Sequence, residues 1–206
     1  MPQVDPSHYN FREYDHKGRW VSYWHQIDEV LSAGALNCAE VGTGSGVVNA
    51  VLRLRGIEMV TIDFDPALNP DRVGDLRRLP ADDDEFDVVL CCQVLEHLPF
   101  EDVPQALREL GRIARQRLVV SVPRSGRVFE VRLKVPAGAK LAWSGITPAR
   151  KPFAFDGEHY WQAGATNYPL SLVRRVFQEA LVLERDFQVP EYPYHHFFVM
   201  RPRKVQ

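Results

Sequence analysis

The sequence has few cysteines and no long apolar run. Its three cysteines, Cys38, Cys91 and Cys92, are odd in number, and two of them are adjacent within an apolar segment. A secreted disulfide framework is therefore a poor explanation, and reduced thiols packed in a core are expected. No run of about 18 apolar residues is present, so a membrane partner is not expected. No charged-then-apolar leader begins the chain, and we expect a cytoplasmic protein.

The chain also lacks a strong excess of either charge. Its 25 Lys and Arg residues against 27 Asp and Glu residues give a formal net charge of -2 at pH 7. This balance supplies no general basic field for nucleic acid. No internal repeat or low-complexity tract is visible, which argues against solenoids and disordered scaffolds. We expect one domain over residues 1–206, large enough to bury a core without disulfides.

Strand and helix patterns alternate along most of the chain. The predicted helices are 22–33, 47–55, 102–114 and 169–181, and the predicted strands are 36–41, 58–63, 86–92, 117–122, 182–188 and 195–200. The alternation predicts an α/β fold with an open, doubly wound and mostly parallel sheet, whose ligand crevice lies at the carboxyl ends of the strands. We expect the last strand to close the sheet edge in an antiparallel pairing.

Residues 124–168 break this periodicity. The segment is rich in Pro, Gly and aromatic residues, and these are densest over 153–161. A stretch of this length inside a compact domain is usually functional or carries small elements of its own. We interpret it as an aromatic-rich insertion that covers the active site after the fifth strand. His159, Tyr160 and Trp161 would line a substrate pocket, although simple packing explains them nearly as well.

Residues 40–46 read Glu-Val-Gly-Thr-Gly-Ser-Gly between a predicted strand and a predicted helix. Three alternate glycines let the backbone lie against a ligand. Asp63, at the end of the next predicted strand, is placed to hold the ribose hydroxyls of an adenosine derivative. A dinucleotide site would have a third glycine where Val47 stands, so a nicotinamide cofactor is disfavoured. Glu40 makes the site acidic, which suits a cationic ligand bearing an amino group.

The order of these motifs resembles class I S-adenosylmethionine-dependent methyltransferases, in particular the small single-domain group similar to ubiquinone and menaquinone biosynthesis methyltransferases. The resemblance covers residues 20–123 and, more loosely, the C-terminal strands. Its segments are Glu40 to Gly46, Asp63 in Val-Thr-Ile-Asp-Phe-Asp-Pro, 74–80 (Gly-Asp-Leu-Arg-Arg-Leu-Pro) and 85–98, which ends in Gln-Val-Leu-Glu-His-Leu. It implies a Rossmann-like seven-stranded sheet with an antiparallel final strand, S-adenosylmethionine as cofactor and S-adenosylhomocysteine as product.

By this resemblance, the cofactor is held by residues from all four segments. The implied residues are Glu40, Gly42, Thr43, Gly44 and Gly46 at the amino-acid end, Asp63 on the ribose, Phe64, Asp75 and Leu76 at the adenine, and Gln93 and His97 at the methionine part. We expect residues 1–33 to form an N-terminal cap and helix, from which Arg19 would pair with the cofactor carboxylate.

The sequence indicates the catalytic residues less clearly than the cofactor site. His97 and His159 are the candidate general bases, because imidazole accepts a proton near neutral pH. Packing at a helix entry explains His97 equally well. No metal site is expected, because the acids at 82–85 are typical of a solvated turn and His195 and His196 have no cysteine or carboxylate at zinc spacing.

Two functions therefore stay open. The first is methyl transfer to an unidentified, small-molecule acceptor, and the alternative is a non-catalytic methyltransferase-like binding module. DNA is a poor acceptor candidate, because the amino-methylating DNA enzymes that the family contains carry Asn/Asp-Pro-Pro-aromatic where this chain reads Cys92-Gln-Val-Leu-Glu-His97. The oligomeric state is unknown at this stage.

Overall fold

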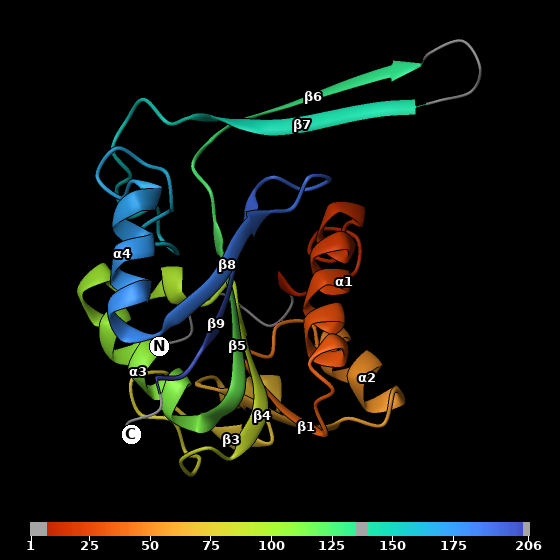
Figure 1. The fold of residues 1–206 in the computed structure, drawn as a ribbon, viewed down its shortest axis with the longest axis vertical. Helices are drawn as coiled ribbons and strands as arrows, with labels where there is room; N and C mark the ends of the chain where they lie inside the picture. Colours follow the sequence, from red (N-terminus) through yellow and green to blue (C-terminus); the bar gives the residue numbers. More distant parts are fainter. Residues whose placement is uncertain (1–7, 135–139, 204–206) are drawn as a thin grey trace.

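A seven-stranded sheet runs through the centre of the protein, with helices on both faces (Figure 1). The computed structural model describes residues 8–134 and 140–203. The strands of the sheet are β1 (Asn37–Val41), β2 (Glu58–Asp63), β3 (Arg72–Val73), β4 (Phe86–Cys92), β5 (Ala114–Pro123), β8 (Val182–Gln188) and β9 (His195–Arg201). The α-helices are α1 (Lys17–Ser32), α2 (Val47–Leu54), α3 (Val103–Ile113) and α4 (Leu170–Ala180).

The strand order is β3-β2-β1-β4-β5-β9-β8. All pairs from β3 to β5 are parallel, whereas β9 runs antiparallel to both β5 and β8. The predicted mostly parallel sheet of seven strands with an antiparallel final strand is thus confirmed. Two short 3-10 helices, η3 (Leu95–His97) and η4 (Phe100–Asp102), follow β4 before α3 begins.

The apolar core lies in two layers, one on each face of the sheet. Helices α1 and α2 contribute to one cluster, which includes Val88 and Leu90 of β4. Helices α3 and α4 contribute to the other, which includes Val89 and Cys91 of the same strand. Because successive side chains of a strand point to opposite faces, β4 must be apolar at nearly every position to fill both layers. The nearly continuous apolar run over 86–92, interrupted only by Asp87, has this physical cause.

The predicted place of the last strand is wrong. β9 lies inside the sheet, between β5 and β8, and β8 forms the edge. Six of the seven β9 residues are buried, whereas none of the β8 residues is. An interior strand has hydrogen-bonded neighbours at both edges and packed layers on both faces, which suits the buried side chains of β9. An edge strand has one open side, which suits the charged and partly exposed side chains of β8.

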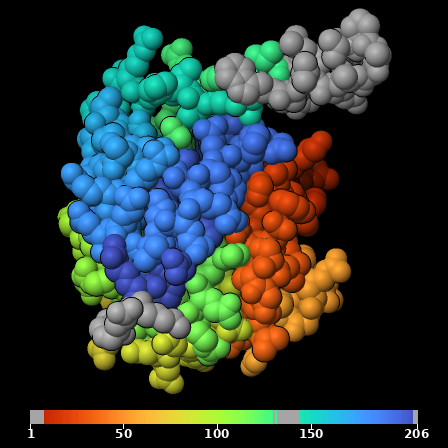
Figure 2. Space-filling model, in the orientation of Figure 1, coloured from red at the N-terminus to blue at the C-terminus, as the bar shows by residue number. Residues whose placement is uncertain are grey.

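The segment after β5 divides into two parts. The first is an antiparallel hairpin of β6 (Gly126–Lys134) and β7 (Lys140–Pro148), which projects beyond the central sheet (Figures 1 and 2). In β7, the Ser144 hydroxyl donates a hydrogen bond to the Pro190 carbonyl in the loop before β9. Residues 149–168 then return to the body of the protein. This second part lies against the 3-10 helix that follows β4, where the Tyr160 N–H donates to the Glu96 carbonyl at 2.8 Å.

No helix in residues 8–134 and 140–203 is long and apolar enough to cross a membrane. Burial raises the pKa of the thiols of Cys38, Cys91 and Cys92, the last to about 12, so these groups stay protonated at neutral pH. None of the three forms a disulfide. Their position in or beside the core agrees with the packing role expected from the sequence.

Asp87 fastens the beginnings of three neighbouring strands and is 5% exposed. Its carboxylate accepts hydrogen bonds from the Leu36 N–H at 2.9 Å and from Arg115 at 2.6 Å. Removing the carboxylate leaves these donors without their acceptor, although the Arg115 side chain is partly exposed and can turn to water. We expect Asp87→Ala to lower the free energy of unfolding by about 2 kcal/mol in urea denaturation.

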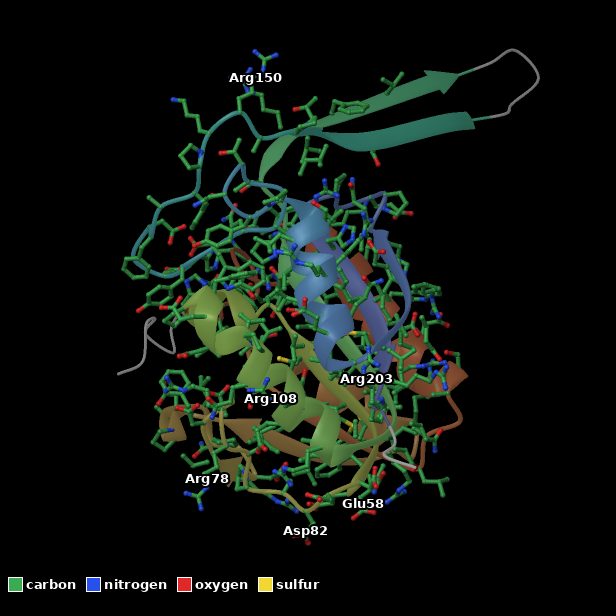
Figure 3. All side chains as sticks on the ribbon, turned by 60° about the vertical axis from the view of Figure 1, so that its left-hand side comes forward. Glu58, Arg78, Asp82, Arg108, Arg150 and Arg203 are labelled. Atoms are coloured by element: carbon green, nitrogen blue, oxygen red, sulfur yellow. The ribbon has the colours of Figure 1, made fainter. Side chains whose placement is uncertain are left out.

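Asp82 is the control for this prediction. It is an exposed acid just before the same strand, and its side chain points away from the body (Figure 3). Asp82→Ala should change the free energy of unfolding by less than about 0.5 kcal/mol. Equal effects of the two substitutions would contradict the role given to Asp87.

Candidate functional site

The candidate site is a cleft at the carboxyl ends of β1 and β4. These two strands are neighbours, but the chain leaves β1 for α2 on one face and leaves β4 for α3 on the other. Loops that separate in this way open a crevice, which is the usual ligand site of doubly wound sheets. The cleft is lined by Tyr14, Arg19, Tyr23, Gln26, Glu40, Gly42, Thr43, Gly44, Ser45, Gly46, Val47, Val48, Leu90, Cys92, Gln93 and His195.

The loop after β1 depends on its glycines. Gly42, Gly44 and Gly46 have φ of +87°, +51° and +75°, which is the left-handed region. Gly42 is also crowded, because a Cβ built on it would lie 2.3 Å from Cγ2 of Val94. Only glycine permits this backbone path at no steric cost. The loop consequently presents backbone to the cleft, as the sequence predicts.

Asp63 links this loop to the end of β2. It is 7% exposed, and its carboxylate accepts hydrogen bonds from the Thr43 N–H at 2.8 Å and from the Asp65 N–H at 3.0 Å. Asp65 instead caps the turn that follows, accepting from the Ala67 N–H at 2.9 Å. The two acids therefore have the separate positions expected from the sequence. Phe64 lies between them and is 52% exposed.

Glu40 lies below the glycine loop at the end of β1. Its side chain is buried and accepts a hydrogen bond from Nδ2 of Asn49 at 3.0 Å. Burial raises the pKa of the Glu40 carboxyl to about 7, although Asn49 and the charge of Arg53 oppose the rise. A small change in its surroundings, such as a bound cation, would therefore ionise this group at neutral pH.

Residues 8–32 lie against the glycine loop. The Asp15 carboxylate accepts hydrogen bonds from the Tyr23 hydroxyl at 2.5 Å and from the Ser45 hydroxyl at 2.8 Å. The Arg19 guanidinium lies 3.8 Å from the centroid of the Tyr14 ring, a cation–π contact. These contacts hold the N-terminal segment over the loop and place Arg19 in the cleft lining.

Several polar atoms of the cleft are buried without a hydrogen-bond partner. Within the described parts of the chain, these include Nε of Arg19, Oγ1 of Thr43 and both ring nitrogens of His195. Buried polar groups are nearly always satisfied in folded proteins, so a cluster of exceptions indicates a place for a polar ligand. Burial lowers the pKa of His195 well below its usual value, and its imidazole is neutral at pH 7.

Of the residues expected at the methionine and adenine ends of the cofactor, some line the cleft and others lie outside it. Gln93 lines the cleft with φ of +60°, and its Nε2 donates to the Ser121 hydroxyl at 3.1 Å. The Asp75 carboxylate is bound by the Arg77 guanidinium at 2.6 Å, and Leu76 is buried in the core. Among the described residues, the cleft lining contains neither Asp75 nor Leu76, and it also lacks Asp63, Phe64 and His97. The contacts of Asp75 and Leu76 with adenine stay predictions.

The two candidate bases lie together. The His97 and His159 rings are 4.9 Å apart between centroids and nearly perpendicular. Burial, and then the neighbouring His159, lower the pKa of His97 to about 4, and burial lowers the pKa of His159 as well. Glu96, which sequence reasoning did not select, is fully buried beside them, and burial raises its pKa to about 8.

The three residues proposed for the substrate pocket do not share one environment. His159 is half-buried and Tyr160 is 37% exposed. Trp161 is fully buried, its indole N–H donates to the Leu95 carbonyl at 3.2 Å, and its ring packs against Phe100. Trp161 therefore anchors residues 149–168 in the core, while His159 and Tyr160 lie closer to the surface of the protein.

The chain is similar to known proteins in part of its sequence and in its fold. Residues 39–118 match a family model described as a methyltransferase domain. No curated protein matches the chain. The fold is shared with the PH0226 protein of Pyrococcus horikoshii OT3, with a TM-score of 0.65, 16% identity and coverage of 98% of this chain and 97% of that chain.

Two other solved structures share the fold. The N-methyltransferase NodS of Bradyrhizobium japonicum WM9, solved with S-adenosyl-L-homocysteine, has a TM-score of 0.61 and 13% identity over 92% of this chain and 90% of that chain. The 1,6-didemethyltoxoflavin-N1-methyltransferase of Burkholderia thailandensis has a TM-score of 0.57 and 16% identity over 99% and 93%. Residues 39–118 thus match a methyltransferase domain, and most of the chain shares the fold of a solved methyltransferase that was crystallised with S-adenosyl-L-homocysteine. The chain's kinship with the ubiquinone and menaquinone group stays a prediction.

Gly42 and Gly56 provide a matched test of the glycine loop. Both have positive φ, +87° and +83°, but a Cβ on Gly56 would meet nothing within 4 Å. Gly56→Ala should cost about 1 kcal/mol for the left-handed backbone alone. Gly42→Ala should cost about 2 kcal/mol more in urea denaturation, because the new methyl group overlaps Val94. Equal costs would show that the contact with Val94 does not constrain the loop.

Proposed function

We propose that the protein transfers the methyl group of S-adenosylmethionine to a small-molecule acceptor. The observation that supports this most directly is the cleft at the end of β1, where left-handed glycines lie beside the unpartnered polar atoms of Arg19, Thr43 and His195. The glycine loop would follow the amino-acid end of the cofactor, and Asp63 would accept from its ribose hydroxyls. Arg19 would pair with its carboxylate.

The cofactor, when bound, supplies a methyl group activated by a sulfonium. The protein then mainly has to align the acceptor, exclude water and hold any proton that the acceptor loses. Both imidazoles are neutral at pH 7, but a pKa of about 4 makes His97 a weak proton acceptor, so His159 is the better of the two candidate bases. His159 and Tyr160, on the segment that lies against η3, would contact the acceptor, and the small-molecule class is supported by the bound 1,6-didemethyltoxoflavin of the Burkholderia relative. The cytoplasmic location and the lack of a nucleic-acid partner stay predictions.

Calorimetric titration tests the cofactor assignment. S-adenosylmethionine and S-adenosylhomocysteine should bind with dissociation constants in the micromolar range, and NAD should not bind. Binding of NAD alone would overturn the proposal. Binding of the adenosyl compounds without turnover of any acceptor in a broad screen would favour the non-catalytic binding module.

Asp63→Ala should weaken binding of S-adenosylhomocysteine by at least about tenfold, since a hydrogen bond to a charged group contributes about 1.5–3 kcal/mol. Asp65→Ala is the control, because this neighbouring acid caps the next turn. It should cost about 1 kcal/mol of stability and leave the affinity within about twofold. Unchanged affinity in Asp63→Ala would remove Asp63 from the cofactor site.

The pH dependence of binding should report on Glu40. With a pKa of about 7 in the free protein, the carboxyl is mostly protonated at pH 6 and mostly ionised at pH 8. A cationic ligand binds the ionised form, so the affinity should rise about tenfold from pH 6 to pH 8 and level off above. Glu40→Gln should abolish this rise in calorimetric titrations. A fall in affinity over the same range would show that the ligand prefers the protonated carboxyl.

A further inference from the structure

Glu96, His97 and His159 bring three metal-ligating side chains to one place. One ligand atom from each lies within 4.8 Å of the other two. Glu96 and His97 come from η3, directly after β4, and His159 comes from the segment that follows the hairpin. The Tyr160 N–H donates to the Glu96 carbonyl at 2.8 Å, which holds the two segments together. Two atoms that each lie about 2.1 Å from one zinc ion are at most about 4.2 Å apart, so small rotations of these side chains would bring all three to a single cation.

Glu96 is the side chain of the three that a bound cation would stabilise most, because it is buried without a hydrogen-bond partner among the described residues. It is 0% exposed, and neither carboxylate oxygen has a hydrogen-bond partner in the part of the chain that the structure describes. Arg19 is a charged neighbour that acts on Glu96 through space without donating a hydrogen bond to it. A buried carboxylate is retained in proteins when it is paired or coordinates a metal ion. The acidic run over 82–85 offers no comparable burial, because Asp82, Asp83 and Asp84 are exposed.

The surroundings of His97 resemble those of a metal-bound histidine. Nδ1 of His97 lies 3.1 Å from the Glu158 carbonyl, which can only accept, so Nδ1 carries the proton and Nε2 the lone pair. A backbone carbonyl at the second ring nitrogen is a usual partner that orients ligand histidines. Nδ1 of His159 lies 3.4 Å from the Gln162 amide nitrogen and 3.9 Å from the Asp156 carboxylate, so His159 would bind a metal through Nδ1, or through Nε2 after a change of tautomer.

We propose that Glu96, His97 and His159 bind one divalent transition-metal ion, for which zinc is the best match. Two imidazole nitrogens and one carboxylate are a ligand set typical of zinc sites that keep an open position. The open position would take water, or an oxygen or sulfur atom of a substrate. The sequence did not predict this site, because His159 is far from the other two ligands along the chain. With the ion bound, the two imidazoles would be ligands and not proton acceptors, so this site replaces the base role considered for His97 and His159, whereas cofactor binding in the cleft does not depend on it.

Zinc titration of the full-length, untagged protein tests the site. After treatment with a chelator, the protein should bind one equivalent of zinc chloride by calorimetry and show a higher melting temperature in its presence. Cobalt(II) should bind at the same place and give visible absorption from an ordered site. Magnesium chloride should not compete, because it avoids nitrogen ligands. Absence of stoichiometric zinc binding, or binding of magnesium in its place, would overturn the proposal.

Two variants connect the binding to these residues. Glu96→Gln keeps the shape of the side chain, and His159→Ala changes a half-buried residue of a loop, so both should fold as judged by circular dichroism. Each should weaken zinc binding by about 100-fold. His25→Ala is the control, because His25 lies on α1 beside Phe187 and Phe197, away from the cluster. Unchanged zinc affinity in folded Glu96→Gln and His159→Ala, or an equal loss in His25→Ala, would overturn the assignment.

Discussion

The hydrogen bond from the Thr43 N–H to the Asp63 carboxylate fixes the geometry on which the site depends. It joins the loop after β1 to the end of β2, and the Gly42 N–H to the Ile62 carbonyl at 2.9 Å adds a second link. The loop can approach β2 this closely only because its glycines accept positive φ. The same approach leaves the backbone of the loop facing the crevice between β1 and β4.

In the described parts of the chain, some polar and charged side chains away from the cleft have partners, whereas several of those at the cleft do not. Away from the cleft, the buried carboxylate of Glu29 forms ion pairs with Arg117 and Arg185, and the partly buried carboxylate of Asp186 pairs with Arg174. At the cleft and beside it, Arg19, His195 and Glu96 keep polar atoms without partners among the described residues. Unsatisfied buried groups cost stability, so their concentration at one end of the sheet indicates that ligands complete this region.

The segment after β5 shows how an irregular sequence can position functional groups. Its hairpin projects away from the sheet, but Trp161 is buried against Phe100 and fastens the following residues to the core. Because Trp161 is fixed, His159 lies next to His97 rather than in solvent. Trp161, which the sequence analysis assigned to the substrate pocket, therefore anchors its neighbours in the structure.

The sequence by itself determined the local features: the apolar strand over 86–92, the glycine loop, and Asp63 at the end of the next strand. Each of these features is encoded by residues that are close together in the sequence, so their backbone conformation and burial can be inferred from the local pattern. Only the tertiary structure decided that β9 lies inside the sheet, that His195 faces the cleft, and that Glu96 and His159 meet. Those outcomes depend on which distant surfaces bury one another, and the free energy of that burial belongs to pairs of segments rather than to any one of them.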